Sequence, residues 1–532
     1  MTDKLIQVEN LKVTFKTQGG DIEALRGVSF DIDKSENVAI VGESGSGKSV
    51  TALSLLKLHD QKHVDYPDGR IIYNNRDLML ASEAEMRAIR GQDISMIFQE
   101  PMTSLNPVYP VGVQIQETLK LHRKMDSLTA RKIAIEALDR VGIKEPQQKI
   151  DSFPHMLSGG QRQRAMIAMA LACDPVLLIA DEPTTALDVT VQQQILDLLK
   201  DLQKETGMSV LLITHDLNLV RRFADRVCVM HKGEIVEQAQ SSELFKHPRH
   251  EYTRYLLDSE PESRIAEIEP GKNTVIEAEN IRVYFPVRKG FFKRKVDEVR
   301  AVDNIDVELR QGETLGIVGE SGSGKTTLGM ALLRMQDSTG RIRFRDHIIS
   351  DYREQQMRPL RRFFQIVFQD PFSSLSPRMT VEQIVGEGLK LHYPELDKAQ
   401  RDDRIVAILN EVGLDKGALW RYPHEFSGGQ RQRIAVARTM VLEPDVILLD
   451  EPTSALDVSV QKQVLSLLSD LQVKHKLSYL FISHDLRVVR AMSHRVIVMR
   501  EGKIVEAGDV EQVFDHPQQA YTRELARASI YL

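Results

Sequence analysis

The sequence predicts an α/β protein made of two similar domains in tandem. A glycine-rich motif follows a short apolar run and precedes a helix-like segment twice in the 532 residues. Three further motifs recur at a spacing of 269 positions, so that, for example, Ser158 corresponds to Ser427 and Glu182 to Glu451. A chain of this length is also too long for one ordinary hydrophobic core. Internal repetition at a fixed spacing therefore predicts two copies of one fold.

The composition is that of a globular protein, with 42% hydrophobic and 27% charged residues. The net charge of −6 argues against a general polyanion binder, so we expect no nucleic-acid partner. Cys173 and Cys228 lie in apolar surroundings without metal-type spacing, which favours buried thiols and a reducing compartment. The sequence shows neither a signal-peptide pattern nor an apolar run of about 18 residues, which predicts a soluble cytoplasmic protein.

We place the first domain at residues 1–258, a linker at 259–274 and the second domain at 275–532. The linker carries Pro261, Pro270 and Gly271 among acidic residues, as is typical of a solvated connection. The second copy has extra residues before its glycine-rich motif, near the basic stretch 288–295. This stretch is either a solvated hairpin or a contact for a partner or anionic lipid headgroups.

The glycine-rich motifs have the pattern of phosphate-binding loops. They consist of Gly42, Glu43, Ser44, Gly45, Ser46, Gly47, Lys48 and Ser49, and of Gly319, Glu320, Ser321, Gly322, Ser323, Gly324, Lys325 and Thr326. Glycines let the backbone curl so that its N–H groups point inward, and the following helix adds positive potential. We expect the lysines to reach the β- and γ-phosphates of ATP, and Ser49 and Thr326 to ligate Mg²⁺.

Polar side chains follow apolar strands at the edge where ligands bind in parallel sheets. Asp181 and Asp450 end two such strands and suit a water-mediated contact with Mg²⁺, and the next residues, Glu182 and Glu451, suit a base that polarises attacking water. Gln99 and Gln369 end another pair of strands and suit coordination of Mg²⁺ and attacking water. His215 and His484 end a third pair and suit contact with the γ-phosphate.

Aromatic residues near the start of each half are candidates for stacking on an adenine ring. Phe15 has a counterpart in Phe285, although Tyr284 is a rival in the second half. The other interpretation is a plain core or strand aromatic.

A small-residue turn opens a helix later in each half. The residues are Ser158, Gly159, Gly160 and Gln161 in the first half, and Ser427, Gly428, Gly429 and Gln430 in the second. One interpretation is an ordinary helix N-cap, and the other is a second anion site. Because each half already has a phosphate loop, a second anion site is useful only if it faces another subunit's nucleotide.

These motifs, in this order and twice, resemble those of the ATP-binding-cassette ATPases over nearly the whole chain. The resemblance implies a RecA-like α/β core, an antiparallel β subdomain and a helical subdomain, for which residues 112–157 are suited. It also implies a head-to-tail arrangement with two shared ATP sites. Loop 42–49 then shares one ATP with Ser427, Gly428 and Gly429, and loop 319–326 shares the other with Ser158, Gly159 and Gly160.

A narrower resemblance is to the oligopeptide/dipeptide import branch, and within it to the microcin C/oligopeptide importer ATPases. It rests on residues 98–107 and 368–378, and on His247-Pro248 and His516-Pro517 with the Tyr-Thr-Arg runs at 252–254 and 521–523. It implies two membrane permease subunits, a substrate-binding protein and a place on the cytoplasmic face of the inner membrane. The cysteine-rich tail of some members is missing, so we expect no iron–sulfur cluster.

An alternative is a soluble tandem-cassette ATPase that acts on ribosomes. Such proteins resemble this one in cassette count but join their halves by a long, basic, helical linker. The short acidic segment 259–274 argues against that alternative.

Overall fold

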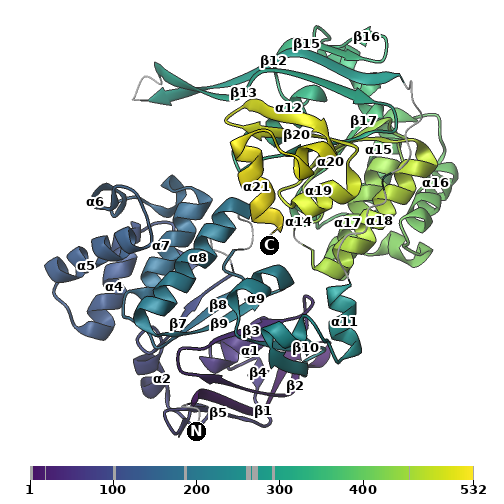
Figure 1. The fold of residues 1–532 in the computed structure, drawn as a ribbon. Helices are drawn as coiled ribbons and strands as arrows, with labels where there is room; N and C mark the ends of the chain where they lie inside the picture. Colours follow the sequence, from purple (N-terminus) through teal and green to yellow (C-terminus); the bar gives the residue numbers. More distant parts are fainter. Residues whose placement is uncertain are drawn as a thin grey trace. The chain divides into compact units, whose positions relative to one another are not determined.

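The computed structural model describes residues 4–17, 19–99, 104–184, 189–258, 265, 273–289, 294–454 and 456–530. The chain divides into two compact units, one comprising Met1–Leu187 and Val191–Ser259 and the other Glu260–Tyr531 (Figure 1). Most of the predicted linker lies outside the described residues, so the linker stays a prediction. Residues 290–293 of the basic stretch also lie outside them, so the hairpin and the contact for a partner or lipid both stay predictions.

The first unit contains two sheets. Their strands are β1 (Lys4–Thr17), β2 (Gly20–Asp33), β3 (Asn37–Val41), β4 (Val64–Asp65), β5 (Arg70–Tyr73), β6 (Arg76–Asp77), β7 (Ile94–Ile97), β8 (Leu177–Asp181), β9 (Ser209–Thr214), β10 (Arg226–His231) and β11 (Glu234–Gln240). The antiparallel sheet has the order β2-β1-β5-β6, with β4 also paired to β1. The other sheet has the order β11-β10-β3-β9-β8-β7, and only β11 pairs antiparallel.

Helices cover the parallel sheet and form a separate group at one end of this unit (Figure 1). They are α1 (Lys48–Leu55), α2 (Glu83–Ile89), α4 (Val111–Arg123), α5 (Ser127–Arg140), α6 (Pro146–Lys149), the 3₁₀ helix η1 (Pro154–Met156), α7 (Gly159–Leu171), α8 (Val189–Thr206), α9 (Leu217–Phe223), α10 (Ser241–Leu244) and α11 (Glu251–Leu257). The helices α4 to α6 fall within the predicted helical insertion.

The second unit repeats this plan. Its strands are β12 (Thr274–Lys289), β13 (Arg294–Arg310), β14 (Thr314–Val318), β15 (Thr339–Phe344), β16 (His347–Ile348), β17 (Phe364–Val367), β18 (Val446–Asp450), β19 (Ser478–Ile482), β20 (Arg495–Arg500) and β21 (Lys503–Asp509). The sheet orders are β13-β12-β15-β16 and β17-β18-β19-β14-β20-β21. The fold class predicted from the sequence, with its antiparallel, parallel and helical parts in each half, is confirmed.

Most helices of the second unit have a counterpart in the first. They are α12 (Lys325–Leu332), α13 (Glu354–Met357), η2 (Arg358–Phe363), α14 (Pro371–Ser374), α15 (Val381–His392), α16 (Lys398–Glu411), η3 (Lys416–Trp420), η4 (Pro423–Glu425), α17 (Gly428–Met440), α18 (Val458–His475), α19 (Leu486–Met492), α20 (Val510–Asp515) and α21 (Ala520–Ile530).

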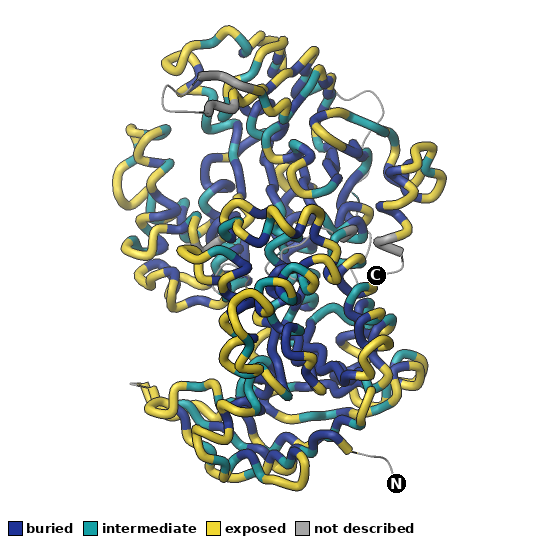
Figure 2. Tube along the Cα trace, turned by 90° about the vertical axis from the view of Figure 1, so that its left-hand side faces the viewer, coloured by how far each residue is buried: buried dark blue, intermediate teal, exposed yellow. Residues whose placement is uncertain are grey.

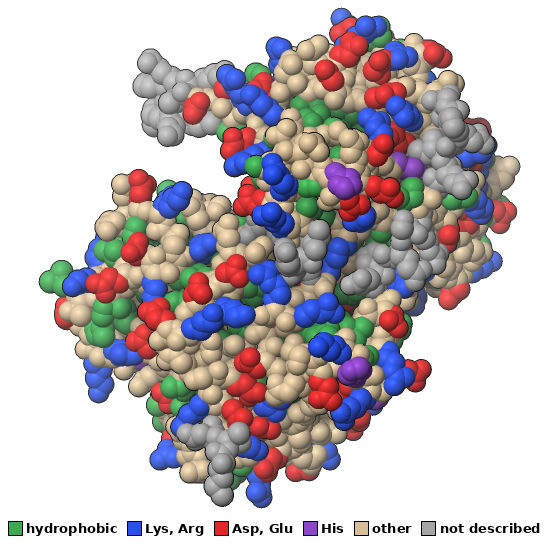
Figure 3. Space-filling view, in the orientation of Figure 1, with side chains coloured by type: hydrophobic (Ala, Val, Ile, Leu, Met, Phe, Trp, Pro, Cys, Tyr) green, Lys and Arg blue, Asp and Glu red, His purple; other side chains and the backbone are tan. Residues whose placement is uncertain are grey.

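The central parallel strands are short and apolar because helices bury both of their faces. All five residues of β3 and of β14 are buried, as are all five of β8 and of β18. Figure 2 shows this buried interior within each unit, surrounded by exposed loops and helix faces. On the face in Figure 3, basic and acidic side chains are interspersed, as the modest net charge predicts.

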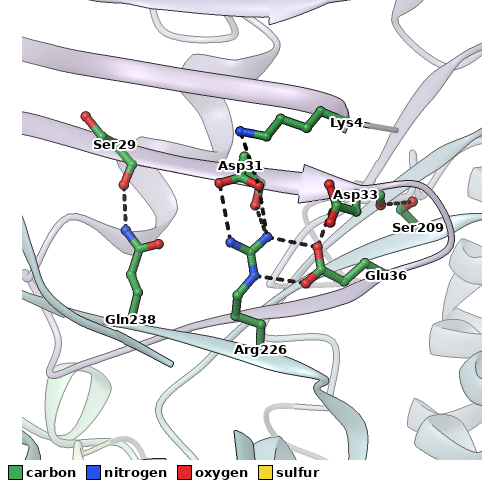
Figure 4. Close-up of polar contacts among 8 residues, drawn as sticks. All are labelled: Lys4, Ser29, Asp31, Asp33, Glu36, Ser209, Arg226 and Gln238. Carbon is green, nitrogen blue, oxygen red and sulfur yellow. Dashed lines mark hydrogen bonds and ion pairs between the residues drawn. The ribbon is translucent and has the colours of Figure 1, made fainter. Parts of the chain in front are cut away.

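A half-buried arginine joins the two sheets of the first unit. Arg226, at the start of β10, donates from Nε and Nη2 to the two oxygens of Glu36 at 2.9 Å each (Figure 4). Its Nη2 also donates to the backbone oxygen of Asp31 in β2 at 2.6 Å. In the second unit Arg495 makes a simpler contact, in which Nη1 donates to Glu313 Oε1 at 3.1 Å. The pair therefore fixes the antiparallel sheet on the edge of the parallel sheet.

We expect Arg226→Met to lower the free energy of unfolding of the first unit by about 2 kcal/mol, because Glu36 keeps its charge and loses its partner. For a domain of this size the midpoint of thermal unfolding then falls by roughly 4–8 °C. Differential scanning calorimetry measures this. Arg249→Met is the control, since its ion pair with Glu243 is exposed. Equal midpoints for the two variants would contradict the bridging role of Arg226.

Candidate nucleotide site in each unit

The phosphate loop lies between a buried strand and a helix, as its sequence predicts. It connects β3 to α1 in the first unit and β14 to α12 in the second. Gly47 and Gly324, which precede these helices, have φ angles of 108° and 103°, a conformation that favours glycine. A Cβ atom on Gly42 would lie 2.2 Å from the backbone oxygen of Met230, so only glycine fits where the loop meets the end of β10.

The lysine of each loop holds the loop's own carbonyl groups. Lys48 Nζ donates to the backbone oxygens of Gly42 and Glu43 at 2.8 Å each. Lys325 Nζ donates to the backbone oxygens of Gly319 and Glu320 at 2.8 and 2.9 Å. Both lysines are buried, so their charge is available inside the curl of the loop and little screened by solvent.

Two buried hydroxyl groups also lie in the loops. The Oγ atoms of Ser46 and Ser323 have no hydrogen-bond partner among the described residues. A buried polar atom without a partner is costly, and a polyphosphate in the loop supplies acceptors for it. The loops therefore fit the phosphate groups of ATP.

A hydroxyl and a carboxylate meet beside each loop. Ser49 Oγ donates to Asp181 Oδ1 at 3.1 Å, and Thr326 Oγ1 donates to Asp450 Oδ1 at 3.0 Å. Burial raises the pKa of Asp181 to about 6 and also raises the pKa of Asp450. Oxygen donors of this kind suit a hard cation such as Mg²⁺. Among the described residues no group of three or more His, Cys, Asp or Glu side chains forms a metal site by itself.

The glutamate that follows each aspartate is held between a glutamine and a histidine. Gln99 Nε2 donates to Glu182 Oε2 at 2.7 Å, and His215 Nδ1 lies 3.0 Å from Glu182 Oε1. In the second unit Gln369 Nε2 lies 2.8 Å from Glu451 Oε2, and His484 Nδ1 lies 3.1 Å from the same oxygen. The structure thus brings together three candidate residues that the sequence separates by more than a hundred positions.

The backbone and the charges of this cluster are also unusual. Glu182 and Glu451 have φ angles of 45° and 47°, in the left-handed region that a glutamate seldom adopts. Strained backbone of this kind concentrates at functional sites.

The glutamates also change the pKa of the histidines. Burial alone would lower the pKa of His215, but the carboxylate of Glu182 outweighs burial and raises it. Glu451 raises the pKa of His484 in the same way.

The signature turns cap their helices. Ser158 Oγ accepts from the backbone N–H of Gln161 at 3.3 Å, and the Gln161 side chain accepts from the N–H of Ser158 at 3.1 Å. Ser427 and Gln430 form the same capping box. The N-cap is therefore observed, and the second anion site stays a prediction.

The two candidate stacking residues differ in their surroundings. The Phe15 ring packs edge-on against His59, with 5.3 Å between the ring centroids. Phe285 is 40% exposed. Its rival Tyr284 lies under the guanidinium of Arg300 and donates its hydroxyl to Asp303 at 2.5 Å. Tyr284 is almost equally exposed, at 38%, so exposure does not choose between the two rings. Adenine stacking stays a prediction for both Phe15 and Phe285.

Sequence reasoning missed a tyrosine contact to each loop. The hydroxyl of Tyr252 accepts from the backbone N–H of Glu43 at 3.1 Å, and Tyr521 contacts Glu320 at the same distance. The feature that could have predicted this contact is the Tyr-Thr-Arg run, which occurs in both halves. From the sequence alone, that run indicated only the branch of the family.

The comparisons with known proteins agree with this geometry. The sequence matches the ABC transporter family over residues 25–185 and 302–454, and the C-terminal region of oligopeptide/dipeptide transporters over residues 236–283. The chain belongs to the ABC transporter family, as an ATPase with two cassettes. The predicted resemblance to the oligopeptide/dipeptide branch is confirmed.

Three relatives cover nearly the whole chain. It is 55% identical to the peptidoglycan transport ATP-binding protein YejF of Agrobacterium fabrum, over 99% of this chain and 97% of the relative. It is 52% identical to the uncharacterized ABC transporter ATP-binding protein YejF of Escherichia coli K12, over 99% and 100%. It is 47% identical to the glutathione import ATP-binding protein GsiA of Salmonella choleraesuis, over 98% and 89%.

An ATP-binding subunit of this family works with permease partners in a membrane transporter. In the part of the chain that the structure describes, no helix combines the length and the apolar character needed to cross a bilayer.

We expect Lys48→Ala and Lys325→Ala each to remove high-affinity ATP binding at one of the two loops. Loss of a buried, charged donor to phosphate weakens binding by roughly 10- to 100-fold. Isothermal titration calorimetry at micromolar ATP measures the affinity and the number of ATP molecules bound. We expect about one ATP per chain for either variant. The control is Lys246→Ala, on an exposed side chain. Two ATP molecules bound with unchanged affinity by Lys48→Ala would contradict the role of that lysine.

Proposed function

We propose that this chain is the ATP-hydrolysing subunit of an importer for peptides or peptide-like compounds. The observation that carries the proposal is the pair of clusters in which a glutamate beside a phosphate loop is held by a glutamine and a histidine. The substrate class is supported by the match to the oligopeptide/dipeptide transporter region and by relatives named for peptidoglycan transport and glutathione import.

We assign one role to each residue of the cluster. Glu182 and Glu451 accept a proton from the attacking water as it approaches the γ-phosphate. Gln99 and Gln369 orient that water and the carboxylate without adding charge. His215 and His484 also hold the carboxylate and contact the γ-phosphate. Lys48 and Lys325 leave the loop carbonyls and stabilise the charge on the β- and γ-phosphates.

We assign Mg²⁺ to Ser49 with Asp181 and Gln99, and to Thr326 with Asp450 and Gln369. When bound, the ion neutralises charge on the transferred phosphate. The donor sets support this assignment, since hydroxyl, carboxylate and amide oxygens are the ligands that the ion prefers.

We also propose that each ATP is completed by the other domain. Loop 42–49 would share its ATP with Ser427, Gly428 and Gly429, and loop 319–326 with Ser158, Gly159 and Gly160. The two capped helix starts support this, because each leaves backbone N–H groups for an anion. The domain boundaries 1–258 and 275–532 are part of this proposal, with residues 259–274 as the connection.

The transporter would contain two membrane permease subunits and receive cargo from a substrate-binding protein, with this chain on the cytoplasmic face of the inner membrane. Co-purification of this chain with membrane permease subunits tests this directly. ATPase activity in the reconstituted complex should rise when a peptide-loaded binding protein is added. Association with ribosomes in place of membranes would overturn the proposal.

We expect Glu182→Gln with Glu451→Gln to bind ATP normally and to hydrolyse it at least ~100-fold more slowly, since the amide cannot accept the proton. Equilibrium dialysis measures binding, and phosphate release measures turnover. The exposed Glu205→Gln serves as the control. Turnover within about threefold of the unmodified chain would remove these glutamates from the base role.

A further inference from the structure

A helix after each cassette core reaches back to the phosphate loop. Tyr252, in α11, accepts a hydrogen bond from the backbone N–H of Glu43 at 3.1 Å, although 209 positions separate the two residues. Tyr521, in α21, accepts from Glu320 at 3.1 Å across 201 positions. The same contact therefore occurs twice, formed by two helices that share the Tyr-Thr-Arg run and differ in length.

The tyrosine rings are fixed by their neighbours. Tyr252 is 8% exposed, and its ring centroid lies 3.9 Å from that of His231, the last residue of β10. Tyr521 is 6% exposed, and the guanidinium of Arg500, at the end of β20, lies 4.8 Å from its ring centroid. A buried ring in one orientation places its hydroxyl at one point, which suits a positioning contact.

A glutamate fixes the start of each helix. The carboxylate of Glu237, on β11, accepts from the backbone N–H groups of Arg249 and His250 at 2.9 Å each. Glu506, on β21, accepts from Gln518 and Gln519 at 2.8 and 3.1 Å. Burial would raise the pKa of Glu237, but hydrogen bonds to its carboxylate outweigh burial and lower the pKa. The glutamates are thus charged anchors that hold each helix against its sheet.

A second hydrogen bond to the loop comes from the turn that joins the last two strands of the parallel sheet, β10 and β11 in the first unit. The backbone N–H of Gly233, in the turn between β10 and β11, donates to the backbone oxygen of Ser46 at 2.9 Å. Gly502 donates to Ser323 at 3.0 Å. The loop is therefore held near its start by the tyrosine and near its middle by the turn, on groups other than the lysine and hydroxyls assigned to phosphate.

We propose that Tyr252 and Tyr521 are positioning residues that keep the empty phosphate loop in the shape that binds ATP. This gives a role to the C-terminal region, since Tyr252 lies within the segment 236–283 that matches oligopeptide/dipeptide transporters. Without the hydroxyl, the loop samples other conformations before ATP binds, and the cost of ordering it lowers affinity.

The test is the full chain with Tyr252→Phe and Tyr521→Phe together. Phenylalanine keeps the buried ring and removes only the hydroxyl. We expect the Kd and KM for ATP to rise about three- to tenfold, the range of one hydrogen bond, while kcat at saturating ATP stays unchanged. Hydrogen exchange in the peptides that contain Glu43 and Glu320 should become faster in the absence of nucleotide.

Tyr255→Phe is the matched control, because Tyr255 lies on the same helix and is 47% exposed. It should leave affinity and exchange unchanged. If the double variant loses thermal stability but keeps its ATP affinity and exchange rates, the tyrosines only pack, and the proposal is overturned. A fall in kcat with unchanged KM would also overturn it, because the hydroxyls would then act on the chemical step.

Discussion

The close approach of the phosphate loop to a strand end is the constraint on which each site depends. At Gly42 and Gly319 a side chain would meet the backbone oxygen of Met230 or Met499 at 2.2 Å. The loop can therefore lie flat against the end of β10 or β20, where the carboxyl ends of the parallel strands gather. The hydroxyl of Ser49 then meets Asp181 from β8, and the lysine points into the curl.

The same sheet edge explains why distant motifs form one cluster. Strands β7, β8 and β9 are neighbours in the sheet, and Gln99, Glu182 and His215 follow them at its carboxyl edge. The strand register sets their separation within hydrogen-bond distance, while the left-handed backbone of Glu182 turns its carboxylate between its two partners. The second unit reaches the same geometry with different strand residues, so sheet order and motif position determine it.

Much of this was accessible from the sequence. Short apolar runs marked the buried strands, glycine spacing marked the loops, and residues that end strands marked the cluster, because these features depend on local chemistry and period. The contact of Tyr252 with Glu43 was not accessible, since it depends on where α11 packs after the chain has returned to the sheet. The hydrogen bonds of Lys48 to the carbonyl groups of its own loop were also not predicted, because the motif describes only the state with phosphate bound.

The most direct test of this account is the structure of the chain with Glu182→Gln and Glu451→Gln bound to Mg²⁺ and ATP. The account predicts an ATP on each phosphate loop, with Lys48 and Lys325 Nζ moved from the loop carbonyls to the phosphates. It also predicts that Ser46 and Ser323 gain a hydrogen-bond partner. ATP bound elsewhere, or lysines that stay on the backbone oxygens of Gly42 and Gly319, would contradict it.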